Sequence, residues 1–192
     1  MRNLARKRDL ILNREMVFAN AIGAAVMQKP KVSYWMVLIP ILFLFFFYRM
    51  QKYKKGRQEF DLQLMTARRQ AMELAEAALA SGHKPDVAAA VRQSGLPEVL
   101  ESPFGAWLRA LSAFYMGLLK ADGDSFDALV RSTYPDRSRF LLDLNRLDQV
   151  EKDFYAVLAP RLTEVEGAVE IIGLIQARSR ELRLEMARRI FA

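Results

Sequence analysis

The longest uncharged stretch of the chain is residues 32–48, with the sequence VSYWMVLIPILFLFFFY, and Lys31 and Arg49 bound it. As a helix it would be about 25 Å long at ~1.5 Å per residue, slightly short of a ~30 Å hydrocarbon core. Aromatic side chains of the kind enriched at membrane interfaces mark both ends: Tyr34, Trp35 and Tyr48. The run therefore predicts one membrane segment.

Pro40 lies at the centre of this run and leaves two topologies open. One is a single crossing with a proline kink, which membrane helices tolerate. The other is a re-entrant hairpin bent at Pro40, with both flanks on one face. The Lys- and Arg-rich flank after the run predicts a cytoplasmic location for the larger part of the chain. The arm before the run, residues 1–31, is also basic and therefore resists export across the membrane, which favours the hairpin. Single crossings are the commoner arrangement in membrane proteins, so the crossing keeps a small advantage over the hairpin.

The net charge of +7 is distributed unevenly. Residues 1–57 hold 12 Lys/Arg and two acidic residues, whereas residues 58–192 hold 17 Lys/Arg and 20 acidic residues. Basic side chains on both sides of a membrane segment fit anionic lipid head groups rather than nucleic acid, which needs them on the folded domain. We expect these membrane contacts, several of them in the basic juxtamembrane linker 49–57: Trp35, Pro40, Tyr48, Arg49, Lys52, Lys54, Lys55 and Arg57.

Residues 1–31 carry a basic amphipathic helix, expected over 3–28. Leu4, Ile11, Phe18 and Ala25 recur every seven positions, and arginines crowd near its start. A basic head with an apolar stripe predicts a helix lying in the membrane interface. The alternative is a helix that packs on the cytoplasmic domain.

Residues 58–192 predict a cytoplasmic bundle of about five or six helices, and the fold class is all-α. Apolar side chains recur at helical spacing, and no stretch alternates as strands do. Capping residues and prolines set the expected boundaries: a helix over 57–80, a short one from Pro85-Asp86 to Ser94, a third opened by Pro103, a fourth over 125–133, a fifth from about Asp136 to Pro160 and a sixth over 162–190. The third is the most apolar and is expected at the core.

The sequence offers no catalytic or metal-binding pattern, so we expect neither an enzyme nor a cofactor. The chain has no cysteine and one histidine, His83, in a turn. Asp122, Asp124 and Asp127 lack the spacing of a calcium loop, and Asp124 is better interpreted as a helix N-cap. Glutamates near residue 166 lack the histidines of a di-iron bundle.

These features predict a membrane-anchored, non-catalytic adaptor or accessory subunit, whose cytoplasmic domain binds a protein of a larger membrane complex. The sequence does not say whether another copy of the chain is such a partner. Trp107 and Phe114 on the third helix, and Ile172 and Arg183 on the sixth, are the expected partner surface. The alternative is a protein that handles a lipid or quinone in an apolar pocket. That pocket would lie among Phe104, Trp107, Phe114 and Phe140, and a cavity of several hundred Å³ would favour it.

Overall fold

The computed structural model describes residues 2–27, 56–162 and 167–192, and within these ranges the chain forms seven α-helices, one 3-10 helix and no strand. The all-α prediction is confirmed for this part of the chain. Within the same ranges, no helix combines the length and apolar character that crossing a bilayer requires. The predicted membrane segment 32–48 lies outside the described residues, as do the expected membrane contacts apart from Arg57, whose side chain is not described either.

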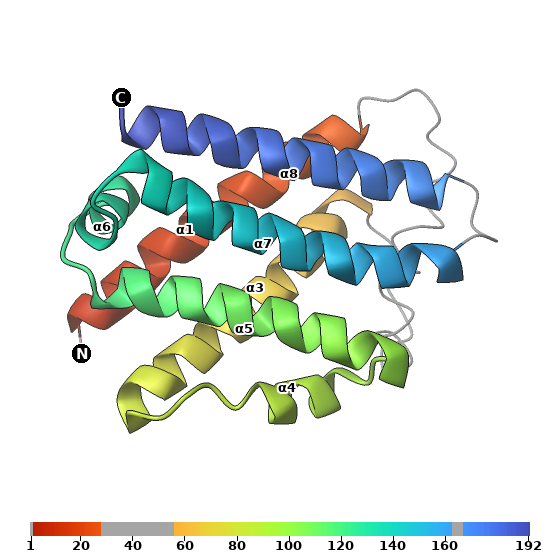
Figure 1. Ribbon diagram of the computed structural model, residues 1–192, viewed down its shortest axis with the longest axis horizontal. Coiled ribbons are helices and arrows are strands. Elements are labelled where there is room, and N and C mark those ends of the chain that lie inside the picture. Colours follow the sequence, from red (N-terminus) through yellow and green to blue (C-terminus); the bar gives the residue numbers. More distant parts are fainter. Residues whose placement is uncertain (1, 28–55, 163–166) are drawn as a thin grey trace.

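The helices form one bundle (Figure 1). α5, α7 and α8 run almost parallel to one another across the view, and α1 and α3 cross behind them. Their bounds are α1 Arg2–Met27, α3 Gly56–Ser81, α4 Val87–Ser94, α5 Glu98–Lys120, α6 Phe126–Thr133, α7 Arg137–Leu158 and α8 Ala168–Ile190, with the 3-10 helix η2 at Ala159–Arg161.

Local capping explains most of these boundaries. Asp86 and Asp136 each accept a hydrogen bond from a backbone N–H three residues later, at 3.1 Å and 2.8 Å, as expected for N-caps. Gly82 and Gly95 adopt positive φ angles of 72° and 66° just after α3 and α4, which confirms them as helix stops. The predicted cap of α6 was off by one residue, because the Ser125 hydroxyl, not Asp124, accepts from the Ala128 amide.

Two predicted helix starts differ from the structure. The third helix was expected to open at Pro103, but α5 begins at Glu98, follows Pro97, and carries Pro103 inside it. The extra turn buries Leu100 completely, and this apolar burial offsets part of the cost of the backbone hydrogen bond that the proline lacks. The last helix was expected from residue 162, but Leu162 is not helical and α8 begins at Ala168, after Gly167 with its left-handed φ of 82°. Residues 163–166 lie outside the described part of the chain.

α5 lies at the centre of the bundle, as its apolar character predicts. It contacts α3 and α7 most extensively, and also α4, α1 and α6. Phe104, Leu108, Leu111, Tyr115 and Leu118 along its stripe are all buried. The bundle is therefore assembled around α5.

The structure corrects the expected placement of α1. This helix packs against α3, α5, α6 and α8, so its apolar stripe faces protein rather than a lipid interface. Ile11, Ala19 and Ile22 on that stripe are fully buried. The basic first turns of α1 also pack against the bundle. Lys7 is buried, and its Nζ lies 3.4 Å from the Leu119 carbonyl oxygen at the C-terminal end of α5, where the helix dipole favours a cation. α1 therefore belongs to the same body as α3–α8.

Candidate functional site

A buried ionic cluster joins α1, α3, α7 and α8. Arg68 on α3 is only 1% exposed, and its Nε donates to the Glu15 carboxylate of α1 at 2.7 Å. Arg183 on α8 donates to two carboxylates of α7, Asp148 and Glu151, and its Nη2 lies 2.8 Å from Glu151. Two guanidinium groups and three carboxylates therefore link four helices.

Phe18 of α1 connects the two halves of this cluster. The guanidinium carbons of Arg68 and Arg183 each lie 5.3 Å from the centre of its ring. A cation at this distance from an aromatic face is attracted by the ring quadrupole, and the attraction grows when water is excluded. Phe18 thus fixes α1 between α3 and α8.

The electrostatics of the cluster indicate a structural role. Burial alone would lower the pKa of Arg68, but the Glu15 and Glu151 carboxylates outweigh it and raise that pKa above its ordinary value. Burial raises the pKa of the Tyr115 hydroxyl well above its ordinary range, and the negative charge of Glu15 adds to this effect. Burial also raises the pKa of Asp148, against the opposing effect of Arg183. At neutral pH the arginine remains charged and the tyrosine remains protonated, so neither is poised to exchange a proton.

The cavity on the α1 side of the cluster is very small. The cavity between Glu15, Phe18, Arg68 and Phe114 has a volume of about 20 Å³, which is room for one water molecule. A larger hollow, of about 470 Å³, opens between α7 and α8, and the cluster carboxylates Asp148 and Glu151 are among the residues that line it. The cluster therefore holds four helices together, and its α7 side borders this hollow.

The four residues expected to form a partner surface lie inside the protein. Trp107, Phe114, Ile172 and Arg183 are between 4% and 7% exposed. Trp107 stacks on Phe154 with ring centres 5.5 Å apart, and Arg183 belongs to the ionic cluster. The apolar faces of the two helices were identified correctly, but other helices of the bundle cover them.

The aromatic residues proposed as a lipid or quinone pocket fill one another's space. Phe104 lies 6.1 Å from Trp107, and Phe114 lies 6.4 Å from Phe140, between ring centres. The cavity that touches Phe114 is the one of about 20 Å³ already described. An acyl chain or quinone ring would need a volume at least ten times larger.

The remaining sequence candidates have ordinary local roles. His83 Nδ1 lies 2.9 Å from the Ser81 carbonyl oxygen within the turn after α3. Asp122 is fully exposed near Lys7, and Asp127 pairs with Arg189 at 3.0 Å. Across residues 2–27, 56–162 and 167–192, no three His, Cys, Asp or Glu side chains gather closely enough to hold a metal ion.

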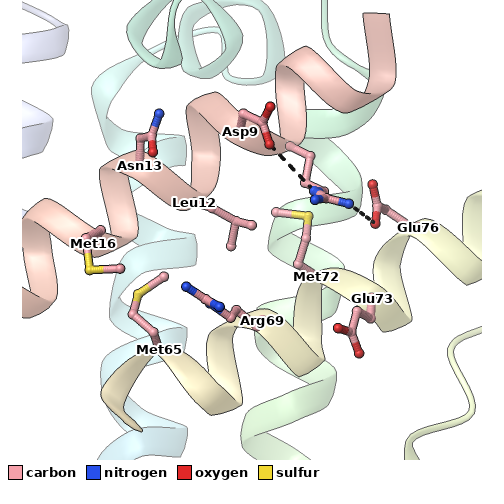
Figure 2. A pocket seen from close by; sticks show the side chains of 10 residues that line it. Asp9, Leu12, Asn13, Met16, Met65, Arg69, Met72, Glu73 and Glu76 are labelled. Atoms are coloured by element: carbon pink, nitrogen blue, oxygen red, sulfur yellow. Dashed lines mark ion pairs between the residues drawn. The ribbon is translucent and has the colours of Figure 1, made fainter. Parts of the chain in front are cut away.

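A groove lies between α1 and α3, with a volume of about 540 Å³ (Figure 2). Leu12 and Met16 are half-buried at its base, and Met65 and Met72 lie buried beneath it. Its two lips are polar: Arg8, Asp9 and Asn13 on α1, and Arg69, Glu73 and Glu76 on α3. We call this feature the α1–α3 groove.

Sequence reasoning missed both the ionic cluster and the α1–α3 groove. One signal was present for the cluster: Arg68 follows Ala67 and precedes Ala71 on an apolar stripe, where a charge needs a buried partner. Glu151 interrupted the stripe of its helix in the same way. The groove had no such signal, because it exists only where two helices meet.

Comparison of the chain with protein-family models, with curated proteins and with solved structures found no match. Any statement about function therefore rests on the sequence and on the geometry described above.

Proposed function

We propose that this chain is a membrane-anchored, non-catalytic adaptor or accessory subunit. Residues 32–48 insert into the membrane as a re-entrant hairpin, with both flanking helices on the cytoplasmic face. The helical bundle then binds a protein of a larger complex at that face. The single observation that carries the topology is the packing of α1 inside the bundle.

α1 and α3 are the two described helices on either side of the apolar run, and they pack against each other and against the same neighbours, α5 among them. The last turn of α1 and the first turn of α3 lie at the same end of the bundle, on the right in Figure 1. Both flanks of the run are therefore attached to one body. A segment that starts and ends on one body must enter and leave the membrane by the same face.

A single crossing would require α1 to leave the bundle. Each of its buried isoleucines, Ile11 and Ile22, contributes about 1.5–3 kcal/mol by its burial. Separating Glu15 from Arg68 would add about 3–5 kcal/mol, because it leaves a buried charge without its partner. Together these losses approach the whole stability of an ordinary domain, about 5–15 kcal/mol. The hairpin avoids them.

The dimensions of the run fit this topology. Eight residues lie on each side of Pro40, and as helix they would reach about 12 Å, less than half of a ~30 Å hydrocarbon core. Proline at the bend also removes one amide hydrogen that lipid could not satisfy. Insertion into one leaflet follows from these lengths.

A non-catalytic role is supported by the way the buried polar groups are used. Arg68 and Arg183 are engaged with carboxylates that link helices, and the cavity that both arginines line has room for one water molecule. The aromatic side chains of the alternative lipid or quinone pocket pack closely against one another. No observation therefore supports a lipid- or quinone-handling protein. The mechanism is placement: an anchored bundle raises the effective concentration of its binding surface for partners at the membrane.

Cysteine labelling tests the topology. Because the chain has no cysteine, single cysteines at Asn3 and Ala192 report each terminus separately, and both positions are exposed. We expect a membrane-impermeant maleimide to spare both in intact cells and to label both after permeabilisation. Labelling of the Asn3→Cys variant alone in intact cells would demonstrate a crossing. Release of the protein by carbonate at high pH would refute the anchor.

A further inference from the structure

The hollow of about 470 Å³ between α7 and α8 is polar almost throughout, and we call it the α7–α8 hollow. Among the described residues, no aromatic or large apolar side chain lines it. α8 contributes two small residues, Gly173 and Ala177, and a Cβ added at Gly173 would meet nothing within 4 Å. The volume lies in the range of small-molecule sites, about 300–1,000 Å³. The lining favours a polar molecule, because an apolar one would cover these polar groups without satisfying them.

The base of the α7–α8 hollow carries a negative charge that the described residues do not neutralise. Within the ionic cluster, Glu15 pairs with Arg68, which leaves Arg183 to serve both Asp148 and Glu151. The Glu151 side chain is only 3% exposed, and its Oε2 lies 2.8 Å from Arg183. Its Oε1 is buried and accepts no hydrogen bond from any described residue. A buried acceptor without a donor is costly, and because Glu151 lines the hollow, a donor bound there is the available partner for this oxygen.

An ammonium group fits this base better than a metal ion or a water molecule. No three His, Cys, Asp or Glu side chains gather in residues 2–27, 56–162 and 167–192, so a metal ion would lack protein ligands there. A water molecule would satisfy the hydrogen bond but not the charge. An ammonium group has three N–H donors for the carboxylate oxygens of Asp148 and Glu151, and its single positive charge equals the excess negative charge at the base.

The rim of the hollow carries the opposite charge. Lys152 on α7 and Arg180 on α8 are exposed, and neither makes an ion pair or a hydrogen bond with a described residue. Burial raises the pKa of Asp148, and Arg180 lies near enough to oppose that rise, so rim and base border the same space. Lys152 follows Asp148 by one helical turn, ~6 Å along the axis. Two cations above a negative base favour a molecule whose anionic group lies a few bonds from its amine.

We propose that the α7–α8 hollow binds a small zwitterionic amino acid, with its ammonium group on Asp148 and Glu151 and its carboxylate on Lys152 and Arg180. An amine without a carboxylate would leave the rim cations without a partner, and a simple anion would meet the acids of the base. The amide side chains in the lining favour a short polar side chain over an apolar one. The site does not depend on the proposed membrane anchor, and it gives the non-catalytic bundle a small molecule to which it responds.

Isothermal titration calorimetry of the full chain in detergent micelles tests the chemistry of the site. The probes are glycine, L-serine, L-asparagine and L-glutamine, each at up to about 10 mM and at two temperatures. We expect saturable binding of at least one. Its amide derivative lacks the carboxylate and its N-acetyl derivative lacks the ammonium group, so each should bind at least about tenfold more weakly. No binding of any of the four, or a derivative that binds as tightly as its parent, overturns the proposal.

Substitutions test the location of the site. Since the Cβ position of Gly173 is open, Gly173→Leu should fill the hollow and weaken the bound amino acid by at least about tenfold. The matched control Ala156→Leu adds the same side chain at an exposed position of α7 outside the lining and should change nothing. Lys152→Glu should also weaken binding at least about tenfold. Arg188→Glu, which is exposed on α8 outside the lining, should leave it unchanged.

Circular dichroism checks that each variant folds like the wild type, and the exposed change Lys152→Glu keeps the test decisive should Gly173→Leu unfold. Binding that survives either substitution overturns the proposal, as does an equal loss in a variant and its control. The labelling at Asn3 and Ala192 is independent of these measurements, so a failed amino-acid site and a failed anchor are distinguishable.

Discussion

Replacing Arg68 by methionine should be among the most damaging single substitutions in the bundle. Arg68 is almost fully buried and donates to Glu15 at 2.7 Å. Methionine has a similar length to arginine but no charge. The Glu15 side chain, which is only 15% exposed, would therefore keep its carboxylate buried and lose the arginine that pairs with it. Removing one member of a buried pair costs about 3–5 kcal/mol. For a chain of this size, that corresponds to a fall in Tm of about 10 °C.

Urea unfolding of the full chain in detergent micelles, followed by circular dichroism, measures this loss. The matched control is Arg92→Met, which removes an exposed arginine from α4 and should change the free energy of unfolding by no more than about 0.5 kcal/mol. A second variant combines Arg68→Met with Glu15→Leu. Because it leaves neither charge unpaired, it should be more stable than Arg68→Met alone.

The result that would refute the reasoning is a small effect of Arg68→Met. A loss below about 1 kcal/mol would mean that Glu15 reaches water easily and that α1 is loosely held. The argument against a single crossing would then fail as well, since it depends on α1 being fixed in the bundle.

Three further predictions concern the same core. The pKa of Asp148 is raised by burial, so the folded state binds a proton more tightly than the unfolded state, and the stability that Asp148 contributes falls as pH rises above its ordinary value of 3.8. Urea unfolding between about pH 3.5 and 7 should therefore show the free energy of unfolding of wild type falling relative to that of Asp148→Asn, and a constant difference would contradict it. Phe18→Leu keeps an apolar side chain but loses both guanidinium contacts, so it should cost about 1–3 kcal/mol by the same assay, with no measurable loss if those contacts are unimportant. In a Trp35→Phe background, the fluorescence of Trp107 should not respond to a short-chain quinone, because Phe104 and Phe154 fill the space around the indole; saturable quenching would instead support the quinone-binding alternative.

Much of the fold could be predicted from the sequence, because its signals are local. Asp86 and Asp136 cap helices through backbone amides three residues away, and Gly82 ends α3 by adopting a backbone angle that other residues avoid. The stripe of α5 identified the most buried helix before any contact was known. Where the boundaries failed, at Pro103 and at the start of α8, burial of Leu100 and the left-handed conformation of Gly167 decided them.

The sequence by itself determined that the described part of the chain is helical, where most of its helices end, which face of each is apolar, and that one uncharged run of 17 residues follows residue 31. Only the tertiary structure decided what covers each apolar face: α1 packs on protein rather than lipid, Trp107 and Ile172 face inward, and a methionine-lined groove remains between α1 and α3. The physical reason is that periodicity reports the direction of an apolar face but not its partner. The Glu15–Arg68 pair joins residues 53 positions apart, and no local pattern specifies a contact at that separation.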